Sequence, residues 1–244
     1  MELWGTTNCG KVRRENQDVF KTHHDTDNDI VVLVVCDGMG GANAGNIASA
    51  LAADTFMDYI LSTDKTIAEL DEVSLLMSDA VRAANNAVYE KSVTNERYAG
   101  MGTTLTAAIS IPAGAVIVNI GDSRAYHITK SSIKQITKDH SVVEDMISRG
   151  DLTRAEARRH PNKNLITRAL GSSSVEEPDV FNISLNEGDY VLLCSDGLSN
   201  VVFDSELLFE LQHSSSVKLS CEKLIDTALE RGAPDNVTAV ILKK

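Results

Sequence analysis

The chain has few of the residues that mark disordered, disulfide-linked or membrane-spanning proteins. Its four prolines and fifteen glycines are too few for a disordered chain of 244 residues. Its four cysteines form no C-x-x-C pair, and we expect them to be reduced. The apolar run at 30–36 is too short to cross a bilayer, and no basic segment followed by an apolar one opens the chain. We therefore expect a cytoplasmic protein that does not act at a membrane.

Basic residues are also scarce, with 23 against 35 acidic ones and a formal charge of -12. Such a charge repels nucleic-acid backbones and anionic membrane surfaces, so neither is expected as a general partner. Hydrophobic content of 43% is ordinary for a globular protein. We expect one domain over residues 1–244, with ample core.

Motifs for nucleophilic and nucleotide-dependent chemistry are missing or incomplete. The sequence contains no G-x-S-x-G and no Walker lysine, and its six histidines lack ligand spacing. A dinucleotide loop is suggested by Gly38 and Gly40, which follow one expected strand and precede a helix. The third glycine of that motif would fall at Asn43, however, and Asp37 would repel the pyrophosphate. A nucleotide-dependent oxidoreductase remains a rival with a poor motif match.

Hydrophobic periodicity predicts alternating groups of strands and helices. Strands are expected at 1–7, 12–20, 30–36, 190–194 and 237–242, with an antiparallel meander over 102–136. The 30–36 run lacks polar alternation, which is typical of a strand buried on both faces. Apolar stripes predict helices over 48–60, 73–88, 207–211 and 217–228. Paired helices between antiparallel strands favour an α+β fold of two sheets with helical layers outside.

Aspartates stand at the ends of three of these strands. Asp37 follows one buried strand, Asp196 follows another, and Asp235 precedes the last. Each is an ordinary turn residue by itself, but three such coincidences favour one cluster of oxygen ligands. Glycine after Asp37 would let the Gly38 carbonyl join a bound cation. Hard oxygen ligands suit Mg²⁺ or Mn²⁺ better than zinc.

Two further residues have competing interpretations. Arg13, expected in a strand beside Asp18, would be a natural bidentate clamp for phosphate oxygens, although a surface salt bridge is the better explanation of the arginine taken alone. Asp122 lies at an expected hairpin, where it is a metal ligand or a plain turn residue. The basic stretch over 149–168 is a solvated helix face or a surface that steers a phosphorylated or acidic substrate.

Taken together, the motifs closely resemble the metal-dependent type 2C serine/threonine protein phosphatases, particularly their compact bacterial branch. The matching segments occur in the family's order: Arg13 to Asp18, Asp37-Gly38-Met39-Gly40-Gly41, Met101 to Thr104, Gly121 to Tyr126, Cys194 to Leu198 and Asp235 to Thr238. The resemblance implies a four-layer α-β-β-α sandwich of two mainly antiparallel sheets flanked by helix pairs. It also implies a variable flap at roughly 141–170.

The resemblance further implies the roles of the site residues. Asp37 would bridge two Mn²⁺ or Mg²⁺ ions, Gly38 would supply a carbonyl to one, and Asp196 and Asp235 would hold the other. Asp122 would join Asp196 at a third, weaker ion, and Arg13 would bind phosphate. The implied reaction is hydrolysis of phosphoserine and phosphothreonine in proteins by water activated between the two ions. The implied substrates are products of a serine/threonine kinase, and we expect a monomer.

Two positions depart from the family pattern. Gln17 replaces a glutamate of many relatives, and Met39 stands where eukaryotic members have a histidine proposed as general acid. A catalytically silent relative that binds partners through the same fold is the second hypothesis, and the presence of all the matched metal carboxylates disfavours it.

Overall fold

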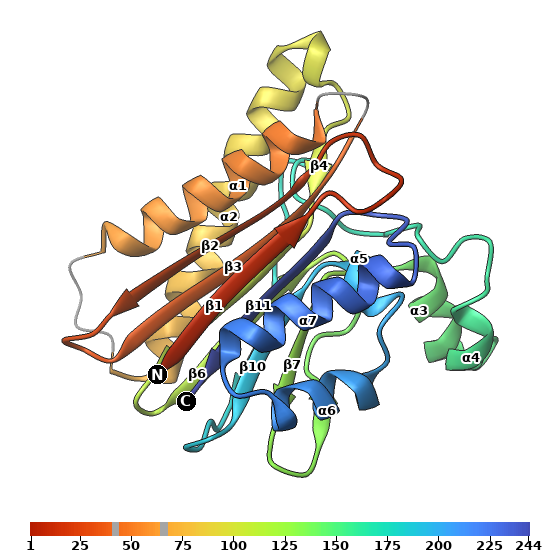
Figure 1. The fold of residues 1–244 in the computed structure, drawn as a ribbon. Helices are drawn as coiled ribbons and strands as arrows, with labels where there is room; N and C mark the ends of the chain where they lie inside the picture. Colours follow the sequence, from red (N-terminus) through yellow and green to blue (C-terminus); the bar gives the residue numbers. More distant parts are fainter. Residues whose placement is uncertain (41–43, 64–67) are drawn as a thin grey trace.

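Two antiparallel β-sheets packed face to face form the centre of the protein (Figure 1). The structure is a computed structural model that describes residues 1–40, 44–63 and 68–244. The first sheet has the order β1-β11-β10-β7-β8, with bounds Glu2–Asn8, Val237–Lys243, Tyr190–Cys194, Arg124–Ile128 and Ile133–Gln135. The second has the order β2-β3-β5-β6-β9, with bounds Asp18–Asp25, Ile30–Met39, Leu105–Ile111, Gly114–Ile120 and Asp179–Ile183. A short strand, β4 (Gly102–Thr103), pairs with the end of β3.

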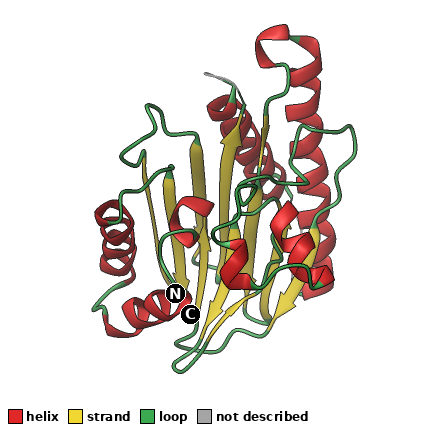
Figure 2. Ribbon diagram, turned by 90° about the vertical axis from the view of Figure 1, so that its right-hand side faces the viewer, coloured by secondary structure: helices red, strands yellow, loops and turns green. Residues whose placement is uncertain are grey.

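Helices cover the outer face of each sheet, as the sequence predicted (Figure 2). Helices α1 (Gly45–Leu61) and α2 (Leu70–Thr94) pack on the second sheet, and η1 (Glu96–Tyr98) follows α2. Helices α5 (Asp196–Ser199), α6 (Asp204–His213) and α7 (Val217–Glu230) lie on the first sheet's side. Two short helices, α3 (Val142–Arg149) and α4 (Arg154–Ala157), lie beside the layers. Among the described residues, no helix has the length and apolar character needed to cross a bilayer.

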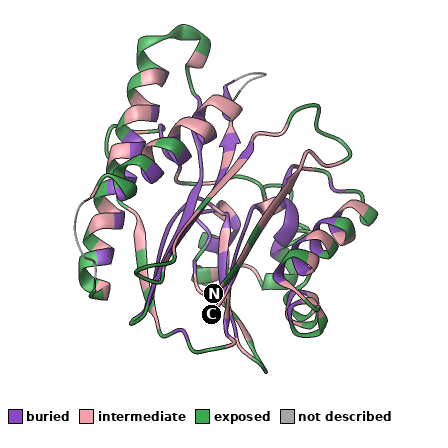
Figure 3. Ribbon diagram, turned by 60° about the vertical axis from the view of Figure 1, so that its left-hand side comes forward, coloured by how far each residue is buried: buried purple, intermediate pink, exposed green. Residues whose placement is uncertain are grey.

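Three apolar cores separate the four layers, and the strand period assigns residues to them. In β3, Val32 and Val34 face α1 and α2, whereas Val31 and Leu33 face the other sheet. Side chains alternate between the faces of a strand, so a strand covered on both sides needs apolar residues at every position. The unbroken apolar run at 30–36 has this cause. Figure 3 shows the buried residues concentrated along the central strands.

The sequence prediction was wrong at two places in the second sheet. Residues 12–17 form turns and an extended loop rather than a strand, and β2 begins at Asp18 and continues to Asp25, five residues past the end of the expected strand. Strand β9 was not predicted. Its alternation of exposed and half-buried residues is that of an edge strand, a weak pattern over five residues.

The expected meander over 102–136 is divided between the two sheets. Strands β5 and β6 pair in the second sheet, and β7 and β8 pair in the first. Gly121, with φ of 106°, turns the chain from one sheet to the other, so Asp122 lies at a crossover and not at a hairpin. Periodicity finds each strand but does not say which sheet it joins.

Candidate active site

Three aspartates from the ends of strands line one pocket. Asp37 lies near the end of β3, Asp196 opens α5 directly after β10, and Asp235 stands two residues before β11. Because β10 and β11 are antiparallel, the end of one lies beside the start of the other. The pocket has a volume of about 210 Å³ and is also lined by Arg13, Gly38 and Asp122. The structure thus brings together all six residues singled out from the sequence.

Negative charge is concentrated in this pocket without enough basic residues to balance it. Burial raises the pKa of Asp37 well above its usual range, and the charges of Asp18 and Asp196 raise it further. Burial and then Asp196 raise the pKa of Asp122 in the same way. The pKa of Asp196 rises to about 7, first through burial and then through repulsion from Asp235. Such a group of carboxylates gains stability from a bound cation.

These raised pKa values predict that the metal-free protein loses stability as the pH rises from about 4 to about 7. In that range the folded protein keeps protons on Asp18 and Asp196, whose pKa values are about 6 and about 7, while the unfolded chain releases them. Because the folded state binds more protons, raising the pH favours unfolding. The melting temperature of chelator-treated protein should fall across this range, and Mn²⁺ should reverse the fall. A flat or rising profile without metal would contradict the electrostatic description of the pocket.

Asp18 belongs to the site, although sequence reasoning named it only as a neighbour of Arg13. It begins β2 directly opposite Asp37 in the antiparallel register and is 4% exposed. The hydroxyls of Ser195 and Thr238 each donate to its Oδ2 at 2.7 Å. Burial raises its pKa to about 6, and the two hydroxyl donors oppose that rise. The signal in the sequence was an aspartate at the start of a strand, which becomes informative only when the register is known.

Glycines allow the backbone to close tightly around the pocket. A Cβ on Gly38 would lie 2.1 Å from the carbonyl oxygen of Gly45 at the start of α1. A Cβ on Gly197 would lie 1.9 Å from the carbonyl oxygen of Asn236. Any side chain at Gly38 would therefore force the end of β3 away from α1, and any side chain at Gly197 would force the start of α5 away from the turn at Asn236. The two positions that depart from the family pattern, Gln17 and Met39, also line the pocket, and Gly41 lies outside the described residues.

Arg13 reaches the pocket from the loop before β2, and Asn236 holds that loop in place. The Arg13 guanidinium donates to Asp235 Oδ2 at 2.7 Å, and just over half of the arginine side chain remains exposed. Asn236 Nδ2 donates to the carbonyl oxygens of Cys9 and Glu15, and its Oδ1 accepts from the backbone N–H of Gln17. Sequence reasoning missed this role of Asn236. The loop that carries Arg13 is thus fixed to the same turn that carries Asp235.

Asp122 is positioned by the crossover and by His140. The backbone N–H of Gly121 donates to His140 Nδ1 at 3.0 Å, and the backbone N–H of His140 donates to the Gly121 carbonyl at 2.9 Å. The hydroxyl of Ser123, on the other side of Asp122, pairs with Thr104 at 2.8 Å. These contacts hold Asp122 against the pocket shared with Asp196.

The oxygen atoms of the pocket fit a hard divalent cation. In the part of the chain that the structure describes, no three His, Cys, Asp or Glu side chains enclose a single ion by themselves. Ions held here would therefore complete their coordination with the Gly38 carbonyl and with water, as hard cations commonly do. Within the same described residues, Asp18 Oδ1 and Asp196 Oδ1 are buried without a hydrogen-bond partner. Orphaned carboxylate oxygens of this kind are the ones that a cation satisfies.

Comparison with known sequences gives matches over nearly the whole chain. The sequence profile of the protein phosphatase 2C family matches residues 7–235. The serine/threonine phosphatase stp of Listeria welshimeri is 33% identical over 238 residues, which are 98% of this chain and 94% of that protein. The protein phosphatase PhpP of Streptococcus pneumoniae is 34% identical over 242 residues, covering 99% of this chain and 97% of that one.

Solved structures match over the whole sandwich. The serine/threonine phosphatase Stp1 of Staphylococcus aureus superposes with a TM-score of 0.93 at 34% identity, covering 100% of this chain and 94% of its own. The catalytic domain of the serine/threonine protein phosphatase PstP, solved with two manganese ions, superposes with a TM-score of 0.85 at 34% identity. That match covers 98% of this chain and 96% of the PstP chain.

Proposed function

Because the chain belongs to the protein phosphatase 2C family, we propose that Asp37, Asp196 and Asp235 hold two Mn²⁺ or Mg²⁺ ions together with the carbonyl oxygen of Gly38. The protein is a metal-dependent serine/threonine phosphatase, neither a silent relative nor the nucleotide-dependent oxidoreductase considered above. The observation that supports the assignment is the convergence of these mutually repelling carboxylates on one pocket. Asp122 shares the pocket with Asp196 and is proposed to hold a third, weaker ion with it.

When bound, the ions supply a water of lowered pKa and neutralise charge on the phosphate. Arg13 lies at the rim with its guanidinium partly exposed, so it can donate two hydrogen bonds to phosphate oxygens as the substrate enters. Asp18 fixes Ser195 beside Asp196 through its buried hydrogen bond and so positions the start of α5. The Thr104 hydroxyl accepts from the backbone N–H of Asp37 and pairs with the Ser123 hydroxyl, so the Thr104 hydroxyl has a structural role. Direct attack by water is therefore the reaction that this pocket supports.

We further propose that residues 1–244 form one catalytic domain with a flap over roughly 141–170. Isolated bridges tie this segment to itself and to the active-site end, pairing Ser141 with Ile166 and Thr103 with Leu170. We propose a monomer, since one chain supplies every residue of the pocket. Four free thiols support a reducing, cytoplasmic location. The substrates are proposed to be proteins phosphorylated by a serine/threonine kinase.

Metal dependence is the direct test of this assignment. Hydrolysis of p-nitrophenyl phosphate and of a phosphothreonine peptide should stop with excess EDTA and return when Mn²⁺ is added beyond the chelator, because water at neutral pH is a poor nucleophile without a bound cation. Phosphate release measures both reactions. Turnover that is unaffected by chelation would rule out the proposed function.

A further inference from the structure

A second pocket adjoins the active site on the side of the flap. It has a volume of about 450 Å³, and Asp122 and Asp196 line both pockets, so the two pockets meet at these carboxylates. Its outer wall comes from α3, α4 and the loop that follows them, and its inner wall comes from β7, β8 and the start of α6. We call it the flap pocket; its lining includes Lys138, Asp139, Glu144, Arg158, Lys163 and Asp204.

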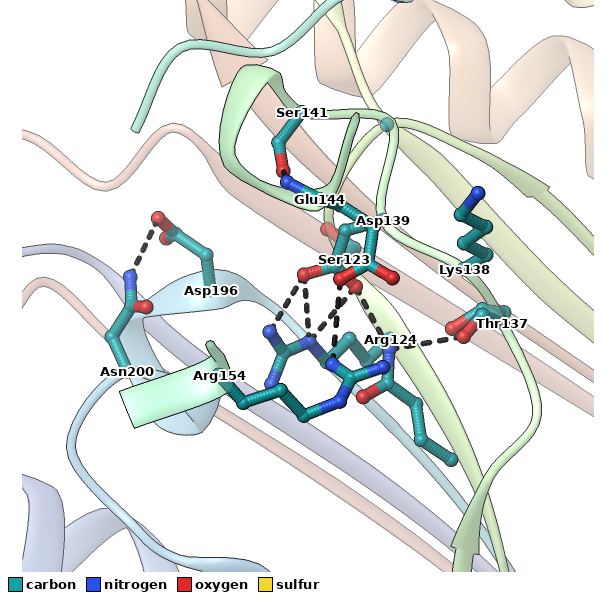
Figure 4. A network of polar contacts seen from close by, with 12 residues as sticks. Ser123, Arg124, Thr137, Lys138, Asp139, Ser141, Glu144, Arg154, Asp196 and Asn200 are labelled. Atoms are coloured by element: carbon teal, nitrogen blue, oxygen red, sulfur yellow. Dashed lines mark hydrogen bonds and ion pairs between the residues drawn. The ribbon is translucent and has the colours of Figure 1, made fainter. Parts of the chain in front are cut away.

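Two of the carboxylates that line the flap pocket, Asp139 and Glu144, are paired with arginines of the protein. Asp139 accepts from Arg124 through both of its oxygens, with a shortest distance of 2.6 Å, and also from Gln135. Arg154 reaches from α4 toward Glu144 at 3.3 Å (Figure 4). Asp122 and Asp196 face the proposed metal ions. With the proposed ions bound, Asp204 is therefore the lining carboxylate left to repel an acidic ligand.

The basic side chains on the outer wall are not balanced in the same way. Arg158 lies over the ring of Phe203, with 4.5 Å between its guanidinium carbon and the ring centroid. Within the described residues Arg158, Lys163 and Lys138 form no ion pair with an acidic group, and Asp204 is the remaining carboxylate of the lining without a basic partner. Contact with Phe203 orients Arg158 and leaves its N–H groups available.

The basic side chains of the outer wall belong to a basic segment in an otherwise acidic protein. The chain carries a net charge of -12, yet residues 149–168 contain six basic and two acidic side chains. A protein of this charge repels acidic segments over most of its surface. The flap pocket is therefore a place beside the active site where an acidic side chain would be attracted.

We propose that the flap pocket binds an acidic side chain of the protein substrate that flanks the phosphorylated residue, and that Arg158 and Lys163 are its contacts. The inference rests on the proposed function, since it requires the phosphorylated residue to lie at the pocket formed by Asp37 and Asp196. A peptide chain bound there continues past Asp122 and Asp196 into the flap pocket. The guanidinium of Arg158 then accommodates a carboxylate in a bidentate geometry, and the ammonium of Lys163 adds a second charge.

Three phosphothreonine peptides of equal length test the proposal, with glutamate, glutamine or lysine at the positions flanking the phosphothreonine on both sides. With Mn²⁺ present, kcat/KM for the glutamate peptide should exceed that for the glutamine peptide about fivefold, because two partly exposed charge pairs act together. The lysine peptide should be the poorest substrate. Raising the salt concentration should reduce the glutamate preference, because exposed charges are screened.

Variants locate the preference on the flap. Arg158→Gln combined with Lys163→Gln should bring the ratio of the glutamate to the glutamine peptide close to one. Arg159→Gln is the matched control, because Arg159 is as exposed as Arg158 but does not line the pocket, and it should retain the wild-type ratio. Lys163→Gln alone should lower the ratio part of the way, which keeps the test informative if the double variant is unstable.

The two proposals fail in different ways. Equal kcat/KM for all three peptides, or a preference for lysine, would overturn the role of the flap pocket while leaving metal-dependent hydrolysis intact. Failure of wild-type protein to hydrolyse any phosphopeptide or p-nitrophenyl phosphate with Mn²⁺ would overturn the proposed function itself. A glutamate preference that survives the double variant would move the recognition site elsewhere on the protein.

Discussion

Replacing Asp37 with asparagine is expected to lower phosphatase turnover by on the order of 10³-fold, because metal ions contribute several kcal/mol to such reactions and each ~1.4 kcal/mol is a factor of ten. Burial and the charges of four nearby aspartates raise the pKa of Asp37 well above its usual range. An asparagine keeps the shape of the side chain and removes the charge that binds cations.

The same substitution should have the opposite effect on the stability of the metal-free protein. Removing one of several repelling carboxylates raises the melting temperature in EDTA, whereas the stabilisation that Mn²⁺ gives to the wild type should be reduced. Asp58→Asn is the matched control, since Asp58 is exposed near the C-terminal end of α1 and does not line the pocket. Phosphate release and thermal melting with and without Mn²⁺ measure both effects. Full activity in Asp37→Asn would disprove its assignment as a metal ligand.

Replacing Arg13 with alanine is expected to lower kcat/KM by about 10- to 100-fold, which is the value of a charge-assisted hydrogen-bond pair to phosphate. The loss should be similar for p-nitrophenyl phosphate and for a phosphopeptide, because both present the same phosphate oxygens. Arg13 also neutralises Asp235 at 2.7 Å, so the variant should bind Mn²⁺ somewhat more tightly as that carboxylate loses its cationic partner. Activity titrated against Mn²⁺ separates the two effects.

The neighbouring arginine provides the control for this prediction. Arg14 is exposed and, within the described residues, forms no ion pair, so Arg14→Ala should leave kcat/KM almost unchanged. A loss of equal size in both variants would mean that the positive charge of the loop matters in general, and that Arg13 has no specific contact with phosphate.

Much of the fold could be predicted from the sequence because buried apolar residues recur with the period of the helix or strand that carries them. The uninterrupted apolar run at 30–36 indicated a strand covered on both faces, and β3 has separate apolar cores on its two sides. The stripes at 48–60 and 73–88 indicated the helices observed as α1 and α2. Periodicity was least informative near Arg13, where the loop is held by side-chain bonds from Asn236 instead of by a strand ladder.

The site residues were predicted from aspartates in the turns next to expected strands. Asp37, Asp196 and Asp235 were found because each adjoins a strong apolar strand, and all three line the same pocket. Asp18 was not assigned a role, since its place in the site follows from its register opposite Asp37 and from donors 177 and 220 residues away. The site of Asp122 was misread as a hairpin, because the next strand belongs to the other sheet.

By itself, the sequence determined the elements, their amphipathic faces and the chemical character of the site, because hydrophobic period and residue type act locally and leave a direct pattern. Only the tertiary structure decided which strands share a sheet, which oxygens face one another and which charges remain unbalanced. Those properties arise from contacts between residues 177 to 222 positions apart, whose energies depend on distance and burial and not on spacing along the chain. One such result is that Arg158 and Lys163, which line a pocket together with Asp196, form no ion pair within the described residues.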